Sequence, residues 1–357
     1  MQYLKNYLNK IISRGNEKLA ESISKTAEDI GKDYISTFSF TSHEIGLLFG
    51  NVQSGKTGQM FGILSKAADL GFPVFLILTT DNVALQQQTI ERVNSDLEGF
   101  CICGEDDMGK FVENSLLDPA IIILKKNNRI LRKWANTLNT TGFMKGNPLF
   151  IIDDEADAAS LNTFINRRGN QQSSINKYLD SIKNGATSSL YLQVTGTPQA
   201  ILLQTLASGW HPYFTYYFQP GSSYLGGDFF FPSSQKPDCI TFLETVKEDT
   251  KEAVLRHIAV SAQVLASGGR VCNALIHPSV RQSAHSTYAK EVKKVLEWCK
   301  ANNAEFKAEI ARHVSNLSPQ KSDKQPDDVL ISKAESLVAN DEISVYIMNG
   351  TNEVDSS

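Results

Sequence analysis

Apolar residues near the N-terminus recur every three to four positions, with polar and charged residues between them. This is the period of an amphipathic helix, and it is set by Tyr3, Leu4, Tyr7, Leu8, Ile11 and Ile12. Gly15 and Gly31 interrupt the pattern. We therefore predict an N-terminal helical segment over residues 1–40 that packs on the rest of the chain.

The pattern changes after residue 45 to short apolar runs that alternate with helical stretches. The runs are rich in leucine and β-branched residues, as is typical of strands buried on both faces of a parallel sheet, and they cover residues 45–49, 74–78, 120–124, 149–152 and 190–194. The lengths between them suit crossover helices, so the pattern predicts a doubly wound α/β domain. Ligands of such domains bind beyond the C-terminal ends of the strands.

Composition narrows the class of protein. A chain of 357 residues with 41% hydrophobic content is long enough for two globular domains. Its net charge of −4 argues against a generally basic surface, so any DNA contact has to come from a local basic patch. Five scattered cysteines favour reduced thiols in a cytoplasmic protein. No apolar run approaches the length of a membrane span, which takes about 18 residues.

The first predicted strand leads into a segment that fits the phosphate-loop pattern G-x-x-x-x-G-K-[ST] and precedes a predicted helix. The segment consists of Gly50, Asn51, Val52, Gln53, Ser54, Gly55, Lys56 and Thr57. Backbone N–H groups of such a loop, together with the helix N-terminus, bind phosphate. Lys56 adds a positive charge for the β- and γ-phosphates, and the Thr57 hydroxyl can bind Mg²⁺. We therefore predict a triphosphate site here.

Four acidic residues surround the end of the strand predicted at 149–152, namely Asp153, Asp154, Glu155 and Asp157. Carboxylate oxygens are the ligands that a hard divalent cation prefers, and an adjacent glutamate can activate the attacking water. One acid alone would more simply cap a helix N-terminus. Four acids in a chain with a phosphate loop favour a metal site.

A third polar segment, residues 195–198 (TGTP), ends the strand predicted at 190–194 and would alone be an ordinary turn. With the phosphate loop and the DEAD sequence at 154–157, it resembles motifs one, two and three of superfamily-two helicase-like ATPases. GNVQSGKTGQMFGILSKAADLGF and IIDDEADAASLNT are more particularly similar to the Z-one domain family, which is associated with bacterial restriction and phage-defence systems. The resemblance covers roughly residues 45–285. It implies two RecA-like lobes, with ATP and Mg²⁺ in the cleft and a nucleic-acid track across them.

The resemblance implies a role for each motif residue. Lys56 would contact the β- and γ-phosphates, while Thr57 and Asp154 would hold Mg²⁺. Glu155 would activate the hydrolytic water. Because Asp153 is additional to the DEAD quartet, which acid lies closest to the metal stays open.

The resemblance says less about the residues of motif three and about recognition of the adenine base. Thr195 and Thr197 would couple the nucleotide site to the other lobe. DEAD-box proteins read adenine with an upstream glutamine, but the only glutamine before Gln53 is Gln2. How this chain would recognise adenine therefore stays open.

Polar and basic side chains follow the second and third predicted strands. In helicase-like motors the equivalent positions contact the nucleic-acid backbone, which positions a strand without reading its sequence. The candidates are Thr79, Thr80, Gln86, Lys125 and Lys126. A solvated helix face is the alternative for all of them, and for the basic residues Arg129, Arg132 and Lys133 that follow.

An aromatic, turn-rich stretch at 213–231 is expected to pack beneath the loops, with a base-stacking platform as the alternative. We place the first RecA-like domain at 41–235 and a partial second one at 236–357. In the second, helices are predicted at 238–266 and 283–301, and strands at 271–276 and 343–348. No arginine follows residue 348 to complete a second-lobe site, so we expect slow ATP hydrolysis and missing C-terminal domains or a partner.

The sequence thus favours a RecA-like P-loop ATPase, helicase-like, that depends on ATP and Mg²⁺ and acts on DNA as a translocase module. Its setting would be a restriction or phage-defence protein, with a nuclease or methyltransferase as partner and no membrane. The alternative is a nucleotide-dependent switch or binding module without translocation. An RNA helicase of the DEAD-box kind ranks third.

Overall fold

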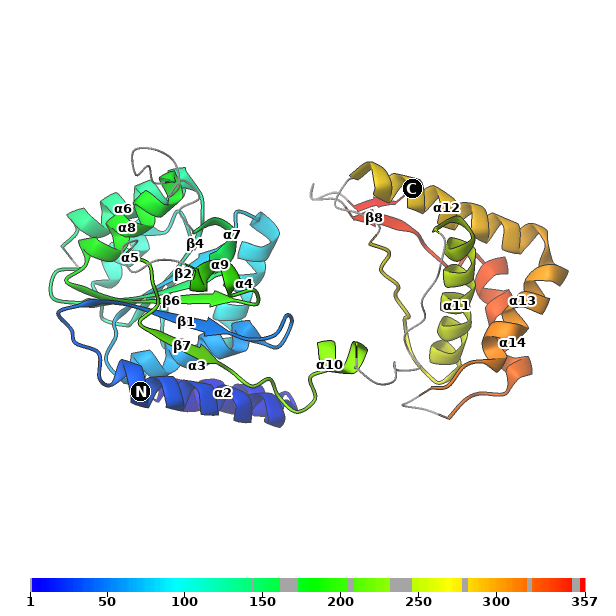
Figure 1. Cartoon of the computed structure of the whole chain (residues 1–357), viewed down its shortest axis with the longest axis horizontal. Coiled ribbons are helices and arrows are strands. Elements are labelled where there is room, and N and C mark those ends of the chain that lie inside the picture. Colours follow the sequence, from blue (N-terminus) through cyan, green and yellow to red (C-terminus); the bar gives the residue numbers. More distant parts are fainter. Residues whose placement is uncertain are drawn as a thin grey trace. The chain divides into compact units, whose positions relative to one another are not determined.

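A sheet of seven parallel strands forms the centre of the first part of the chain (Figure 1). The computed structural model describes residues 2–142, 144–160, 173–203, 209–231, 246–277, 282–319, 323–348 and 354–356. The chain divides into two units, Met1–Phe229 and Phe230–Ser357. The strands of the first unit are β1 (His43–Phe49), β2 (Val74–Thr79), β3 (Cys101–Cys103), β4 (Ala120–Lys125), β5 (Pro148–Asp154), β6 (Ser188–Thr195) and β7 (Phe214–Tyr217).

The strand order is β3-β4-β2-β5-β6-β1-β7, so β6 lies between β1, which leads to the phosphate loop, and β5, which leads to the acids. All five strands predicted from the apolar runs are confirmed, and every pair in this sheet is parallel. The short strands β3 and β7 at the two edges were not predicted. The first unit is therefore the predicted doubly wound, RecA-like α/β domain.

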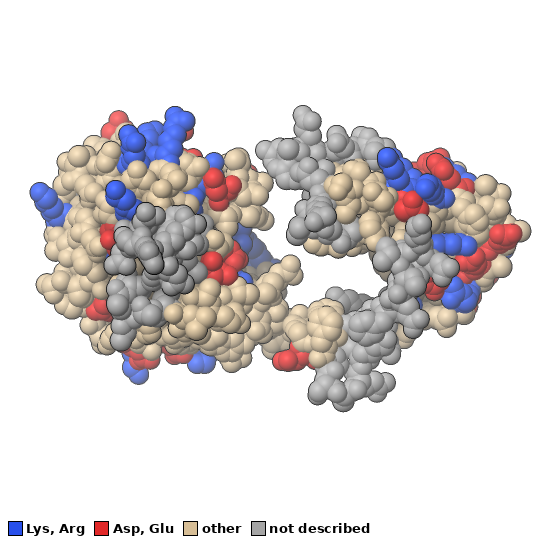
Figure 2. Space-filling view, turned by 45° about the horizontal axis from the view of Figure 1, so that its top comes forward, with Lys and Arg blue, Asp and Glu red and all other residues tan. Residues whose placement is uncertain are grey.

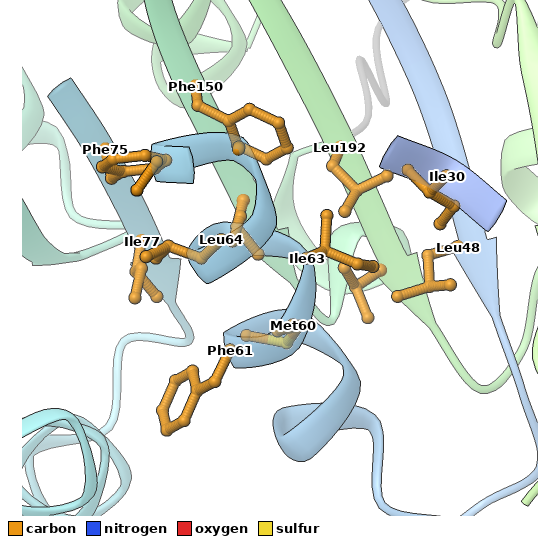
Figure 3. Close-up of a cluster of buried hydrophobic side chains, with 14 of the residues drawn as sticks. Ile30, Leu48, Met60, Phe61, Ile63, Leu64, Phe75, Ile77, Phe150 and Leu192 are labelled. Atoms are coloured by element: carbon orange, nitrogen blue, oxygen red, sulfur yellow. The ribbon is translucent and has the colours of Figure 1, made fainter. Parts of the chain in front are cut away.

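Helices cover both faces of the sheet. They are α1 (Tyr3–Ser13), α2 (Glu17–Ile30), α3 (Lys56–Asp69), α4 (Val83–Asp96), α5 (Met108–Asn114), α6 (Asn128–Thr140), α7 (Ala156–Ala159), α8 (Ser174–Gly185), α9 (Gln199–Leu202) and, at the boundary of the units, α10 (Gly227–Phe230). Successive residues of a strand point to opposite faces, so Phe75 and Ile77 enter one core while Leu76 and Leu78 enter the other. Figure 3 shows the first core, in which α3 packs on β1, β2, β5 and β6.

The helical segment predicted over residues 1–40 is observed as α1, α2 and a π-helical turn, Gly31–Ile35. It packs on α3, the helix that begins at the phosphate loop (Figure 1). A Cβ on Gly62 of α3 would lie 2.4 Å from Cγ2 of Ile23, so the missing side chain lets α2 approach closely. The N-terminal helices therefore belong to the core of the first unit, where Ile23 is fully buried.

The described part of the second unit is mainly helical, with α11 (Val246–Ala266), α12 (Gln282–Ala301), α13 (Asn303–Ser315), α14 (Asp327–Ala339) and an antiparallel pair, β8 (Tyr346–Met348) and β9 (Val354–Ser356). The predicted strand at 271–276 is wrong: these residues form no strand, and Val271 and Leu275 are exposed. The strand predicted at 343–348 is confirmed only as β8. Because the described residues of this unit contain no parallel pair, the partial second RecA-like domain stays a prediction.

Residues 232–245 lie outside the described residues, and with them the first part of the helix predicted at 238–266. The rest of that helix is observed as α11. None of the helices in the described part of the chain has the length and apolar character that crossing a bilayer requires.

Candidate nucleotide-binding site

The phosphate loop connects β1 to α3 in the predicted way. Gly55 has φ +94°, a conformation that L side chains rarely adopt, and it occupies the N-cap of α3. Gly50 lies against Phe218, and a Cβ there would come 2.2 Å from Cε1 of that fully buried ring. Both glycines are thus required by the geometry, one by its backbone angle and the other by its neighbour.

Lys56 begins α3 and lies next to the end of β6. A Cβ on Gly196 would be 3.0 Å from Lys56 Nζ and 3.7 Å from the carbonyl oxygen of Gly50. Among the described residues, the ammonium group makes no hydrogen bond or ion pair. The half-buried lysine therefore has its donors available to an anion at the loop.

The acidic turn faces the same edge of the sheet. Burial and the neighbouring charge of Glu155 raise the pKa of Asp154 to about 6, whereas Lys126 and Lys56 lower it. The charge of Lys56 is thus felt at the Asp154 carboxylate, in keeping with their place at the same edge of the sheet. The two motifs are far apart in sequence, but β6 alone separates their strands in the sheet.

The donor atoms at this edge suit Mg²⁺. Mg²⁺ is usually bound by one or two carboxylates, substrate phosphates and water, not by a complete protein cage. The Thr57 hydroxyl and the Asp154 carboxylate are the oxygen donors that would serve as protein ligands of Mg²⁺. Within the described ranges, no group of three or more His, Cys, Asp or Glu side chains is placed to hold a metal.

Asp153 does not face the nucleotide edge. Its side chain is fully buried and accepts hydrogen bonds from Lys126 Nζ, at 3.0 Å, and from the hydroxyl of Tyr191, at 2.7 Å. A carboxylate engaged in this way is not available to a metal. The choice among acids that the sequence left open therefore favours Asp154.

The last acid of the turn joins motif two to motif three. The hydroxyl of Thr195 donates to Asp157 Oδ1 at 2.6 Å, and the hydroxyl of Thr197 donates to Asp157 Oδ2. Burial would raise the pKa of Asp157, but these two hydrogen bonds, a backbone hydrogen bond and the charge of Lys126 together lower it. Thr195 and Thr197 therefore couple the end of β6 to the acidic turn within the first unit; their predicted coupling to another lobe stays a prediction.

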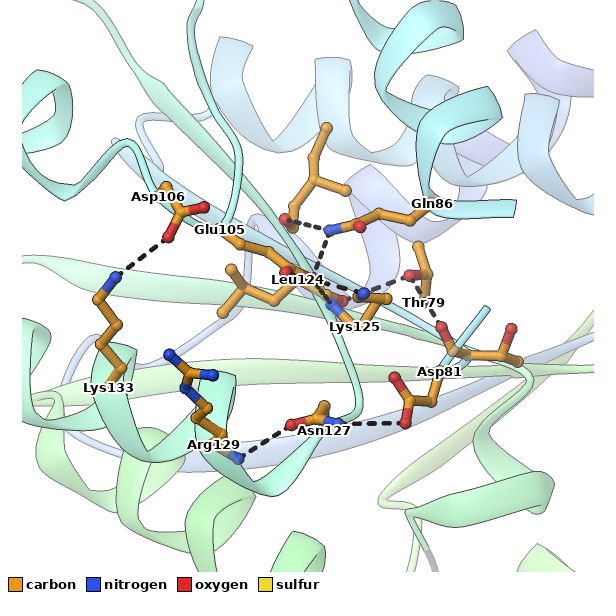
Figure 4. Close-up of polar contacts among 12 residues, drawn as sticks. Thr79, Asp81, Gln86, Glu105, Asp106, Leu124, Lys125, Asn127, Arg129 and Lys133 are labelled. Carbon is orange, nitrogen blue, oxygen red and sulfur yellow. Dashed lines mark hydrogen bonds and ion pairs between the residues drawn. The ribbon is translucent and has the colours of Figure 1, made fainter. Parts of the chain in front are cut away.

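Three of the predicted nucleic-acid contacts are wrong because the side chains are buried. Thr79 is 3% exposed, Gln86 is 7% exposed and Lys126 is 1% exposed. Gln86 Nε2 donates to Glu105 Oε1 at 2.7 Å, and Lys125 lies 3.9 Å from the same carboxylate (Figure 4). These contacts join α4 and the segment after β3 to the end of β4.

Thr80 and Lys125 are only half-buried, so their predicted contacts stay predictions. Arg129, Arg132 and Lys133 on α6 are exposed instead. The basic side chains that can reach a phosphate backbone are thus those on α6. For these residues the sequence pattern favoured a solvated helix face.

Two aromatic residues hold the phosphate loop from outside, and the sequence did not single out either of them. The hydroxyl of Tyr224 donates to the carbonyl oxygen of Val52 at 2.7 Å. Phe218 packs on Gly50, and its backbone N–H bonds to the carbonyl of Phe49. Both aromatics belong to the stretch predicted to pack beneath the loops, and this much of that prediction is confirmed. Only their aromatic character signalled a packing role.

Comparison with known proteins leaves the chain without a family assignment. No family model matches it, and no curated protein matches it. Similar solved structures include the Hef helicase domain of Pyrococcus furiosus, with a TM-score of 0.37 and 13% identity, covering 88% of this chain and 68% of that one. Another is the ORC2 protein of Aeropyrum pernix, solved as ADPNP–ADP complexes, with a TM-score of 0.29 and 10% identity, covering 88% and 93%. Structural similarity at this level assigns no function to the chain.

Proposed function

We propose that the first unit binds ATP with Mg²⁺ and hydrolyses it, as the helicase-like ATPase module of a Z-one protein that acts on DNA. The observation that carries this proposal is the placement of Lys56, Gly196 and Asp154 at the C-terminal ends of three neighbouring strands of one sheet, with Lys56 close to Gly196. Bound magnesium–triphosphate needs a lysine and a glycine-containing turn beside its phosphates, and a carboxylate beside its metal ion. A restriction or phage-defence setting rests on the motifs alone.

The residues divide the chemistry between them. N–H groups of the loop and of the α3 N-terminus bind the phosphates, and Lys56 neutralises charge on the β- and γ-phosphates. Thr57 and Asp154 would hold Mg²⁺, which would supply positive charge to stabilise the transferring phosphoryl group. Glu155 orients the attacking water and accepts its proton.

The basic side chains of the first unit supply the proposed DNA contact. Figure 2 shows several Lys and Arg side chains near the top of the first unit, and others elsewhere on its surface. Of the exposed residues on α6, Lys133 already pairs with Asp106 at 3.1 Å. Among the residues that the structure describes, no such pair involves the guanidinium groups of Arg129 and Arg132. Contacts of this kind bind the backbone without sequence preference.

The nucleotide site is tested with Lys56→Ala and a matched surface variant, Lys177→Ala, whose lysine is exposed on α8. Binding of a fluorescent ATP analogue with Mg²⁺ and release of phosphate are measured for both. Lys56→Ala should lose ATP binding or turnover with an unchanged circular dichroism spectrum, and Lys177→Ala should match the wild type. Unaltered ATP affinity in Lys56→Ala would show that the phosphate site is misassigned.

The DNA proposal is tested by the rate of ATP turnover with and without duplex DNA, single-stranded DNA and RNA. A translocase is stimulated by its track, whereas a nucleotide switch keeps one rate. Arg129→Ala combined with Arg132→Ala should remove the stimulation and leave the basal rate intact. An absence of stimulation by all three nucleic acids would favour the switch.

A further inference from the structure

A fully buried lysine lies beneath the acidic turn. Lys126 follows β4, and its side chain is 0% exposed. Its ammonium group donates to Asp153 Oδ1 at 3.0 Å, to the carbonyl oxygen of Asp154 at 2.7 Å and to the carbonyl oxygen of Glu155 at 2.8 Å. An ammonium group has three donors, so all of them are used, and two of them end on the turn itself.

The charge of this lysine is balanced within the core. Asp153 on β5 is its counter-ion and is fully buried too. The other carboxylate oxygen of Asp153 accepts a hydrogen bond from Tyr191 on β6, whose pKa is raised well above its usual value by burial and by the charge of Asp153. Tyr191 is therefore a neutral donor, and the cluster joins β4, β5 and β6 without an unpaired charge.

The turn above this cluster has an unusual backbone. Glu155 has φ +51° and ψ +52°, the left-handed region that is unfavourable for a residue with a side chain. Such a conformation persists only where the surroundings determine it. The carbonyls on either side of the Glu155 N–Cα bond, those of Asp154 and Glu155, are the ones that Lys126 holds.

We infer that Lys126 is a positioning residue for ATP hydrolysis, which holds the turn so that Asp154 and Glu155 present their carboxylates to the metal and the attacking water. The inference rests on the function proposed above. A buried ammonium group needs an acceptor for each of its three donors, and acceptors anywhere in the core would serve to stabilise it. Here two of the three hydrogen bonds go instead to the backbone of the two residues that the chemistry requires.

The experiment removes the cluster as a unit, because losing one member alone leaves a buried charge unpaired. The triple variant Lys126→Met/Asp153→Leu/Tyr191→Phe replaces it with apolar side chains of similar size, an exchange that proteins often tolerate. The carbonyl of Glu155 keeps its hydrogen bond from the N–H of Ala158. A second variant, Lys126→Met/Asp153→Asn, removes both charges with a smaller change in shape.

Steady-state kinetics separate positioning from folding. We expect folded variants to keep KM for ATP and affinity for a Mg²⁺–ATP analogue within about threefold, while kcat falls about 10- to 100-fold, since a small displacement of a reacting group can cost that much. Lys183→Met is the control: this lysine is also buried but donates to the carbonyl of Gly209, away from the turn. It should keep the wild-type kcat.

The outcomes decide between the roles. A folded triple variant with the wild-type kcat would overturn the inference, and so would failure of both variants to fold, which would assign the cluster to folding alone. A wild-type chain that hydrolyses no ATP would instead contradict the proposed function. An active wild type with an equally active triple variant contradicts only the inference about Lys126.

Discussion

The phosphate loop and the acidic turn lie at the same edge of one sheet, but they are held by different kinds of contact. The loop is enclosed by apolar and aromatic neighbours, with Phe218 against Gly50 and Leu19 3.3 Å from a Cβ on Gly55. The turn is held from below by the charged group of Lys126. The loop depends on glycines, which have no side chain, whereas the turn depends on the buried side chain of Lys126.

This difference follows from what each segment has to do. The loop binds an anion with its backbone N–H groups, so its backbone has to come close to the ligand and to its neighbours. The turn carries two carboxylates close together, and burial, followed by the charge of Glu155, raises the pKa of Asp154. A buried positive charge beneath the turn acts in the opposite direction. Changes to the loop should therefore act on binding, and changes to the turn on hydrolysis.

The largest effect should come from Glu155→Gln. The amide keeps the size of the side chain but cannot accept a proton, so kcat for ATP should fall about 10²- to 10⁴-fold with ATP affinity retained. Single-turnover phosphate release and binding of an ATP analogue are the measurements. Glu113→Gln, at an exposed position of α5, is the control. A variant that loses ATP affinity instead would remove the distinction between loop and turn.

Gly50→Ala should act on the loop through packing. The new Cβ would meet the Phe218 ring at 2.2 Å, and overpacking of this kind costs about 1–3 kcal/mol of stability. Gly109→Ala is the matched control, because a Cβ there meets nothing within 4 Å and the residue lies in α5. Urea denaturation measures both. Phe218→Leu added to Gly50→Ala should restore part of the loss; a Gly50→Ala protein as stable as the control would contradict the close packing.

Thr195→Val combined with Thr197→Val tests the link between β6 and the turn. The low pKa of Asp157 in the folded state contributes stability that is present above its unfolded value, near 3.8, and is lost as pH falls through the lower folded value. Without the hydroxyls, stability at pH 7 should fall by about 1–2 kcal/mol. The difference from the wild type should shrink below pH 4. A difference in unfolding free energy that is equal at pH 7 and pH 3 would contradict this role of Asp157.

The smallest effect should come from Tyr224→Phe, which removes one neutral hydrogen bond to the carbonyl of Val52. The expected loss is about 0.5–1 kcal/mol, or a two- to fivefold weaker binding of ATP, with an unchanged kcat. Isothermal titration calorimetry with an ATP analogue measures it. Tyr213→Phe, at a hydroxyl on an exposed ring, provides the control. A change in kcat would mean that the loop also takes part in hydrolysis.

Local patterns were sufficient for most of the first unit. Continuous apolar runs predicted β1, β2, β4, β5 and β6 because a strand covered on both faces needs an apolar side chain at nearly every position. The edge strands escaped this signal: β3 has three residues, and β7 is an aromatic segment that alternates in burial. The prediction for residues 271–276 was wrong in the opposite sense: an apolar run is present, but the described residues form no strand there.

The doubly wound α/β domain, the phosphate loop and the acids at the end of β5 could be predicted from the sequence, because each depends on residues that are neighbours in the chain. What each polar side chain does at this edge of the sheet depends on contacts between distant segments. Lys126 and Arg129 both follow β4, yet one is buried beneath the acidic turn and the other is exposed. Whether a charge faces solvent or a counter-ion depends on β5 and β6, which pack beside it from far along the chain, and no local spacing encodes that contact.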